Sequence, residues 1–191
     1  MKIIGINGSP RPEGNTAILL REVLQAAAED GMETELVQLR GPISGCIACG
    51  MCRKNQDRKC ALKNDSVNEI MEKVFQSDAV VFGTPSYFAN MTAELKAFID
   101  RLGFTALSNG GLLARKVGAG VIAQRRGGDV HILDSINHMM LMSRMIIPGS
   151  TYWNFGFGLE PGEVAQDEEA MRNMRDLGHT IAWLVQTTQS K

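Results

Sequence analysis

The sequence lacks several features that would by themselves assign the protein to a class. No run of 18 or more apolar residues is present, so no segment predicts a membrane-spanning helix. The 20 Lys and Arg residues are balanced by 21 Asp and Glu residues. Nucleic-acid-binding proteins and membrane-surface helices usually carry a basic excess, so neither kind of partner is expected. No hydrophobic region of signal-peptide length follows Met1, and we therefore expect a cytoplasmic protein.

The sequence does contain a regular alternation of apolar runs with longer stretches of helical period. Strands are predicted at residues 2–7, 33–39, 78–84, 116–124 and 145–150. Helices are predicted at about residues 15–30, 65–76, 92–106, 129–144 and 167–187, with Asp65 as the cap of the second. Strands that alternate with helices form parallel sheets, because a right-handed crossover must carry the chain back before the next strand begins.

Five such units in 191 residues are typical of an α/β fold with a flavodoxin-like doubly wound five-stranded parallel sheet, strand order 2-1-3-4-5, and helices on both faces. We expect a single domain over residues 1–191, with a cysteine-rich insertion at about 41–64. In such sheets, ligands bind at the carboxyl ends of the strands, beside the point where the strand order reverses. The loops at residues 8–14 and 85–90 are therefore the first candidates for a binding site.

The loop after the first predicted strand has the composition of a phosphate site. It leads directly into a helix, whose first N–H groups have no intrahelical acceptor and attract anions. Its spacing fits neither a Walker loop nor a dinucleotide fingerprint, since five residues separate Gly8 from Gly14 and Asn15 follows. The alternative is an ordinary turn in which Asn15 or Thr16 caps the helix. The candidate phosphate ligands are Ser9, Arg11, Asn15 and Thr16.

The loop after the third predicted strand combines a turn-forming proline with two aromatic and two small polar residues. Flat apolar faces next to polar groups are what a planar heteroaromatic ring needs. The residues that would border such a ring are Pro85, Ser86, Tyr87, Phe88 and Asn90.

Three motifs carry a resemblance to a known family. They are G-S-P-R-x-x-G-N-T from Gly8, T-P-S-Y-F from Thr84, and the run from Glu94 to Arg101. In this order they resemble the NADPH-dependent FMN reductase family of flavodoxin-like proteins, which implies FMN as the cofactor. The resemblance implies that the first loop holds the FMN phosphate and that the second borders the isoalloxazine. It also brings a third segment to the flavin, which here contains Gln124, Arg125, Gly127 and Gly128.

The resemblance extends to subunit contacts, although the residues themselves leave simpler alternatives open. The helix that contains Lys96 and Asp100 resembles the dimer surface of the family, which implies a homodimer or homotetramer. An i,i+4 pair of this kind is by itself an ordinary surface contact. Arg125 and Arg126 could equally belong to a solvated turn.

All four cysteines lie in one connection, as C-x2-C-x2-C-x7-C at Cys46, Cys49, Cys52 and Cys60. Three closely spaced thiolates followed by a fourth can wrap a [4Fe-4S] cluster. Zinc sites generally use two C-x2-C pairs set well apart, and free or disulfide-switching thiols are a further alternative. The compact spacing resembles the iron–sulfur flavoprotein branch of the family. Because the connection leaves the carboxyl end of a strand, we expect it on the same edge of the sheet as the flavin.

The function that these interpretations predict is an FMN-dependent oxidoreductase in which the flavin N5, and no catalytic side chain, carries the chemistry. It would take electrons from NAD(P)H or a reduced ferredoxin-type carrier and pass them to a small-molecule acceptor through the cluster. The alternative is a non-catalytic flavodoxin-like electron shuttle, or a thiol or flavin redox sensor without a cluster. Flavodoxin shuttles are usually strongly acidic, whereas this chain has a net charge of −1.

Overall fold

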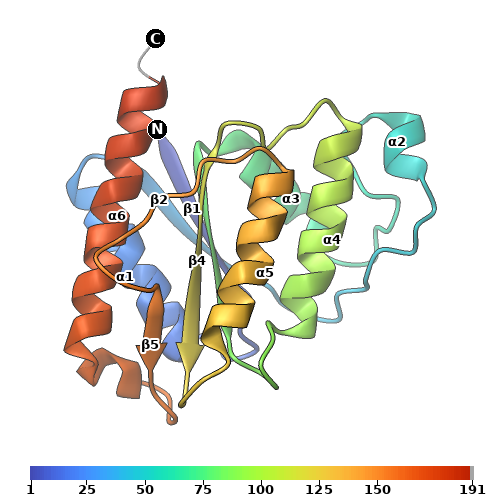
Figure 1. Ribbon diagram of the computed structural model, residues 1–191. Helices are drawn as coiled ribbons and strands as arrows, with labels where there is room; N and C mark the ends of the chain where they lie inside the picture. The colour runs from blue at the N-terminus through green and yellow to red at the C-terminus, as the bar shows by residue number, and fades with distance from the viewer. Residues whose placement is uncertain (190–191) are drawn as a thin grey trace.

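The structure, a computed structural model, describes residues 1–189 and contains one five-stranded sheet with the order β2-β1-β3-β4-β5. Each neighbouring pair of strands is parallel, with Ile6 beside Phe82 on the next strand (Figure 1). This confirms the predicted doubly wound fold and its strand order. The strands are β1 (Lys2–Asn7), β2 (Glu33–Gln38), β3 (Ala79–Pro85), β4 (Val117–Gln124) and β5 (Phe155–Phe157).

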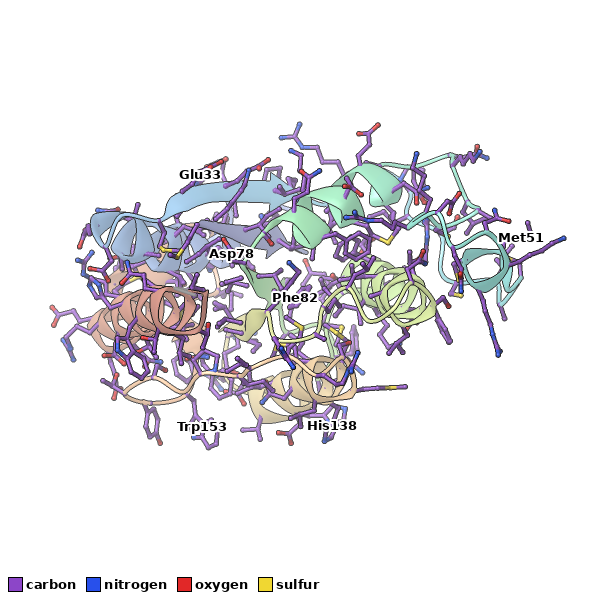
Figure 2. All side chains as sticks on the ribbon, turned by 90° about the horizontal axis from the view of Figure 1, so that it is seen from above. Glu33, Met51, Asp78, Phe82, His138 and Trp153 are labelled. Carbon is purple, nitrogen blue, oxygen red and sulfur yellow. The ribbon has the colours of Figure 1, made fainter. Side chains whose placement is uncertain are left out.

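Helices cover both faces of the sheet (Figure 1). On one face, α1 (Asn15–Glu29) and α6 (Glu168–Gln189) pack on the sheet, and on the other lie α3 (Val67–Gln76), α4 (Ala93–Ser108) and α5 (Asp129–Met142). The central strands β1, β3 and β4 are almost wholly buried, as expected for a parallel sheet that is covered twice. Phe82 is fully buried near the centre of the molecule (Figure 2). No helix in residues 1–189 is long and apolar enough to cross a membrane.

The prediction for the fifth strand is wrong in position. Residues 145–150 supply only an isolated parallel bridge between Ile146 and Val117, and β5 forms later, at Phe155–Phe157. Pro148 has no N–H to donate to a ladder and is followed by Gly149, so the chain leaves the sheet edge after the bridge. It returns where the Ile122 N–H donates to the Asn154 carbonyl at 3.0 Å.

Two short helices were not predicted. The first, α2 (Met51–Asn55), lies in the cysteine-rich connection and begins after Gly50, whose φ of 69° lies in the left-handed region that glycine tolerates. The second is a single 3-10 turn, Glu163–Gln166. Both contain too few residues to show the repeating apolar pattern by which a helix is recognised in a sequence.

Asp65 does not cap α3 as predicted, because the residue at the N-cap position is Ser66. The Asp65 carboxylate accepts a hydrogen bond from the Val67 N–H at 3.2 Å and forms an ion pair with Arg101. Asp65 therefore links the start of α3 to α4.

Candidate functional site

A cavity of about 230 Å³ lies at the carboxyl edge of the sheet. Its walls come from the loops after β1, β3 and β4, the three segments that the sequence predicts, and from a fourth segment after β5. The fourth segment, with Gly158 and Leu159, was not among the predicted binding loops, because it matches no binding motif. The lining residues are Ser9, Arg11, Gly14, Asn15, Thr16, Pro85, Ser86, Tyr87, Ala123, Gln124, Arg125, Gly158 and Leu159.

The loop after β1 is held in shape by its own hydrogen bonds. The Ser9 N–H donates to Asn7 Oδ1 at 3.0 Å, and Ser9 Oγ accepts from the Arg11 N–H at 3.1 Å. Gln38 on β2 donates to the Ser9 carbonyl at 2.7 Å. Ser9 and Thr16 are buried, whereas Arg11 is exposed at the mouth of the cavity. The loop thus presents a helix N-terminus, two hydroxyls and one cation to the same space.

Asn15 has a different role from the one that the sequence suggested for its side chain. Its Nδ2 donates to the Glu160 carbonyl at 3.0 Å, and its Oδ1 accepts from the Gly162 N–H at 2.8 Å. The residue at the N-cap of α1 is Gly14, which makes no side-chain capping bond, so the alternative in which Asn15 or Thr16 caps the helix is wrong. The Asn15 side chain holds the fourth segment against α1 and so closes one wall of the cavity.

The loop after β3 contributes three of its five predicted residues to the cavity, namely Pro85, Ser86 and Tyr87. Tyr87 and Asn90 exchange backbone hydrogen bonds of 2.9 and 3.0 Å, which closes a tight turn. Phe88 lies at the tip of this turn with its side chain fully exposed and a φ of 48°. Phe88 and Asn90 therefore lie outside the wall of the cavity.

The loop after β4 supplies Gln124 and Arg125 to the cavity wall. Gln124 is buried, and its amide donates to the Asp129 carboxylate in the first turn of α5. Gly127 and Gly128 do not line the cavity, but they join this loop to the one after β3. The Ser86 hydroxyl donates to the Gly127 carbonyl at 3.2 Å, and a Cβ on Gly128 would lie 2.8 Å from Ser86 Oγ.

The cavity has the chemistry that a flavin mononucleotide requires. Arg11 and Arg125 line it together with the N-terminus of α1, and none of its lining residues carries a carboxylate. A phosphate group is therefore met by positive charge and N–H donors, without a repelling anion. Pro85 and Tyr87 add the flat apolar faces that a planar ring needs.

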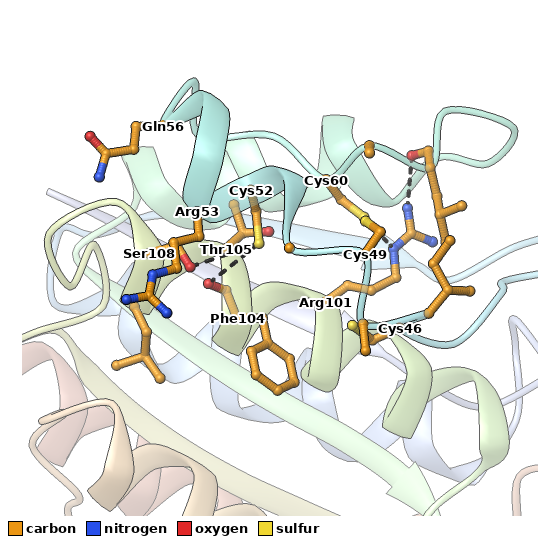
Figure 3. Close-up of a pocket in the computed structure, with 16 residues that line it drawn as sticks. Cys46, Cys49, Cys52, Arg53, Gln56, Cys60, Arg101, Phe104, Thr105 and Ser108 are labelled. Atoms are coloured by element: carbon orange, nitrogen blue, oxygen red, sulfur yellow. Dashed lines mark hydrogen bonds between the residues drawn. The ribbon is translucent and has the colours of Figure 1, made fainter.

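A second and larger cavity, about 540 Å³ in volume, is lined by all four cysteines. It lies between the cysteine-rich connection, α2 and the C-terminal half of α4, from which Phe104 and Ser108 reach its wall (Figure 3). Cys46 and Cys49 are exposed, and Cys52 and Cys60 are partly buried.

The four cysteines surround a space and do not meet at a point. Within residues 1–189, no three His, Cys, Asp or Glu side chains converge as ligands of a single metal ion, so no preformed zinc site is present there. In a cubane cluster each thiolate binds a different iron, and the ligands must surround the cluster. Four thiols around one cavity are a donor set that fits such a cluster.

The two cavities are not on the same edge of the sheet, which corrects the expectation from the sequence. At its start, α4 touches the phosphate loop, because Thr92 Oγ1 donates to the Gly8 carbonyl at 2.7 Å. The cysteine cavity is reached only from Arg101 onward, about 14 Å further along the helix at 1.5 Å per residue. In Figure 1, α2 lies at the end of the molecule opposite the tip of β4. The connection therefore leaves the carboxyl edge and runs back along α4.

Arg101 in α4 ends the third sequence motif, but its place beside the cysteines was not predicted. It is fully buried and lines the cysteine cavity, where it contacts Cys60 and Asp65. Burial lowers the pKa of this guanidinium, but hydrogen bonds to Asp65 and Cys60 outweigh burial and raise the pKa above its ordinary value. A charged residue on the apolar face formed by Leu95, Phe98 and Leu102 was the signal that could have identified it.

Comparisons with known proteins agree with this geometry. The sequence model of the NADPH-dependent FMN reductase family matches residues 1–160. An iron-sulfur flavoprotein from Methanocaldococcus jannaschii is 39% identical over 193 residues, covering 97% of each chain. Another, from Methanosarcina thermophila, is 32% identical over 192 residues, covering 99% of this chain and 97% of the other.

Among solved structures, RosB with a bound flavin-derived intermediate, 8-demethyl-8-formylriboflavin-5'-phosphate, superimposes with a TM-score of 0.78 at 18% identity, over 100% of this chain and 81% of RosB. At this identity the likeness supports the fold alone. The family match over most of the chain, together with a phosphate loop and a ring-binding loop that share one cavity, shows that the protein belongs to the NADPH-dependent FMN reductase family of flavodoxin-like, FMN-binding oxidoreductases.

Proposed function

We propose that this oxidoreductase takes electrons from NAD(P)H, or from a reduced ferredoxin-type carrier, and passes them to a small-molecule acceptor through FMN and a [4Fe-4S] cluster. The observation that carries the proposal is the convergence of the loops after β1, β3 and β4 on one cavity that has cationic residues and no carboxylate in its wall. The family description supports NADPH as a donor.

The residues of the first cavity divide into a phosphate end and a ring end. Ser9, Thr16 and the first N–H groups of α1 would bind the FMN phosphate, and Arg11 would neutralise it from the exposed side. Asn15 supports this end by holding the segment after β5 in place.

At the ring end, Pro85, Ser86 and Tyr87 would border the isoalloxazine, with Phe88 and Asn90 shaping their turn. Gln124 and Arg125 would approach the ring from the loop after β4. Gly127 and Gly128 hold this loop against the loop after β3 through their contacts with Ser86. Arg125 would stabilise the negative charge that develops on a flavin as it is reduced.

FMN, when bound, supplies a group that accepts a hydride or single electrons and needs no protein nucleophile. In the overall reaction with NAD(P)H, the donor loses a hydride and becomes NAD(P)⁺. An acceptor such as a quinone gains two electrons and two protons, one of the protons coming from solvent. The exposed mouth of the cavity, at Arg11 and Tyr87, would admit donor and acceptor in turn.

The four cysteines would hold the cluster in the second cavity. Their placement around one space and the name of the Methanocaldococcus relative support this assignment. About 14 Å of α4, from Thr92 at the phosphate loop to Arg101 at the cysteine cavity, separates the two sites within one copy. Electron-transfer rates fall steeply with distance, so a shorter path to another flavin would be favoured. We therefore propose that the cluster of one copy serves the flavin of a second copy in a homodimer or homotetramer.

The proposal is tested on protein purified without oxygen. The visible spectrum and the iron content report on FMN and the cluster, and steady-state oxidation of NAD(P)H with a quinone reports on turnover. Bound FMN without turnover would favour an electron shuttle or sensor. A colourless protein that does not bind added FMN would contradict the proposal as a whole.

A sharper test of the phosphate end uses Arg11→Ala. Loss of a charge-assisted bond to the phosphate is expected to weaken FMN binding about tenfold or more, at about 1.4 kcal/mol per factor of ten. Arg172→Ala is the control, because Arg172 is an exposed arginine that pairs with Glu168 within α6 itself, away from the cavity. Equal FMN affinity of the two variants would show that the phosphate lies elsewhere.

A further inference from the structure

Arg101 is among the largest fully buried side chains of the protein, and it lies in the wall of the cysteine cavity. A buried cation is costly unless its charge is paired and its donors are satisfied. The partners of this guanidinium therefore indicate what it does.

All five N–H donors of Arg101 have an acceptor, and every acceptor lies in the connection between β2 and α3. Nη1 donates to Asp65 and to the Ser44 carbonyl at 3.2 Å. Nη2 donates to Asp65 Oδ1 and to the Leu62 carbonyl, both at 3.0 Å. The fifth donor, Nε, is directed at Cys60 Sγ, 3.3 Å away (Figure 3).

Four of these bonds are sufficient to anchor the connection to α4, because they form an ion pair and tie two backbone carbonyls. The fifth bond needs a separate explanation. A neutral thiol sulfur is a weak acceptor, whereas a metal-bound thiolate is anionic and a good partner for a charged donor. The Nε–H group is thus suited to a cysteine that acts as a ligand.

Cys60 differs in this respect from the other three cysteines. Cys52 Sγ lies 3.8 Å from Ser108 Oγ and 4.0 Å from the Phe104 carbonyl, both uncharged groups. Cys46 and Cys49 are exposed. Among the four thiols in the described part of the chain, the structure gives a charged hydrogen-bond donor to Cys60.

We propose that Arg101 is a positioning residue that fixes Cys60 as the fourth cluster ligand and, through the Nε–H to Sγ hydrogen bond, raises the reduction potential of the cluster. This inference rests on the proposed function, because it needs a cluster held by the four cysteines. Hydrogen bonds to ligand sulfurs are one of the factors that set the potential of a cluster. One-electron reduction adds negative charge, so a donor beside a ligand sulfur stabilises the reduced form more than the oxidised form.

The first test replaces the ion pair by two neutral residues, Arg101→Met with Asp65→Asn, in the full-length protein reconstituted with iron and sulfide without oxygen. The pair Arg101–Asp65 has no net charge before or after the change, so a shift in potential does not arise from a change in the net charge of the protein. We expect a more negative midpoint potential in an electrode titration followed by electron paramagnetic resonance.

A second variant covers the case in which the double variant does not fold. Arg101→Lys keeps a cation for Asp65 but places a methylene group where Nε stands, so it removes the donor to Cys60. Its midpoint potential is also expected to be more negative than that of the wild type. The control is Arg58→Met with Glu72→Gln, an exposed pair 3.3 Å apart that joins the same connection to α3, and it should keep the wild-type potential.

The outcomes separate the inference from the proposed function. Iron-loaded Arg101 variants with the wild-type potential would overturn the inference and leave the cluster in place. A wild-type protein that takes up no iron would overturn the cluster assignment and the role of Arg101 together. A negative shift in both Arg101 variants, with none in the Arg58 control, is the supporting result.

Discussion

Thr92 Oγ1 donates a hydrogen bond to the carbonyl of Gly8 at 2.7 Å, which ties the first residue before α4 to the loop after β1. The same hydroxyl accepts from the Leu95 N–H at 3.3 Å and so caps the helix. Gly8 must be glycine at this contact, since a Cβ there would lie 2.8 Å from Leu95 Cβ. One buried threonine thus holds together the phosphate loop and the helix that reaches the cysteine cavity.

Replacement of Thr92 by valine should therefore weaken both the fold and the cofactor site. The change leaves the buried Gly8 carbonyl without a donor and removes the cap of α4, at a cost of about 1–3 kcal/mol in the free energy of unfolding. Urea unfolding and titration with FMN measure the two effects. Thr92→Ser keeps the hydroxyl and should retain most of the stability and most of the FMN affinity. A Thr92→Val variant with wild-type stability would contradict this account.

Gly158→Ala tests the segment after β5. A Cβ at this position would lie 2.7 Å from Asn15 Nδ2 and 2.8 Å from the Val164 backbone nitrogen, so the segment must move away from α1. We expect FMN binding to weaken severalfold, measured by quenching of flavin fluorescence. Gly149→Ala is the matched control, because nothing lies within 4 Å of its added Cβ. Equal affinities for the two variants would show that the segment does not shape the site.

Arg125→Met tests the ring end of the flavin cavity. A cation beside the flavin stabilises charge that develops on reduction, so its loss should make the midpoint potential of bound FMN more negative. Arg126→Met is the control, since Arg126 follows in sequence but does not line this cavity. Potentials measured with reference dyes should shift in the first variant only, and a shift of the same size in both would assign the effect to the overall charge of the loop.

Asp65 makes the stability of the fold sensitive to acid, through its hydrogen bonds with Arg101 and Val67. Burial alone would raise the pKa of this carboxyl, but hydrogen bonds from Arg101 and Val67 outweigh burial and hold the pKa below its ordinary value of 3.8. Because the folded state has the lower pKa, the stabilisation is complete above this ordinary pKa and is lost as the pH falls through the folded value.

Asp65→Asn should therefore lower stability most at neutral pH, by about 3 kcal/mol, because it leaves the buried Arg101 unpaired. The difference from the wild type should shrink as the pH falls below about 4. Urea unfolding across this pH range measures it, with the exposed Asp134→Asn on α5 as the control. A difference that is independent of pH would contradict the assignment of the ion pair.

Two features of the site could be predicted because their signals are local. The glycines and hydroxyls before α1 mark a helix N-terminus, and the cysteine spacing lies within one short connection. The strand order followed from the alternation of strands and helices, which permits few topologies. The fifth strand was misplaced because a three-residue strand at a sheet edge has almost no pattern of its own, and Pro148 interrupts the apolar run that precedes it.

The amino-acid sequence by itself determined the order of the strands, the two loops that meet at their carboxyl ends and the set of four cysteines, since each depends on residues that are neighbours along the chain. Only the tertiary structure decided that the cysteines lie along the far half of α4, that Asn15 binds the segment after β5 and that Arg101 reaches Cys60. These contacts join residues more than 40 positions apart. They depend on how helices pack against the sheet and against one another, which no local pattern encodes.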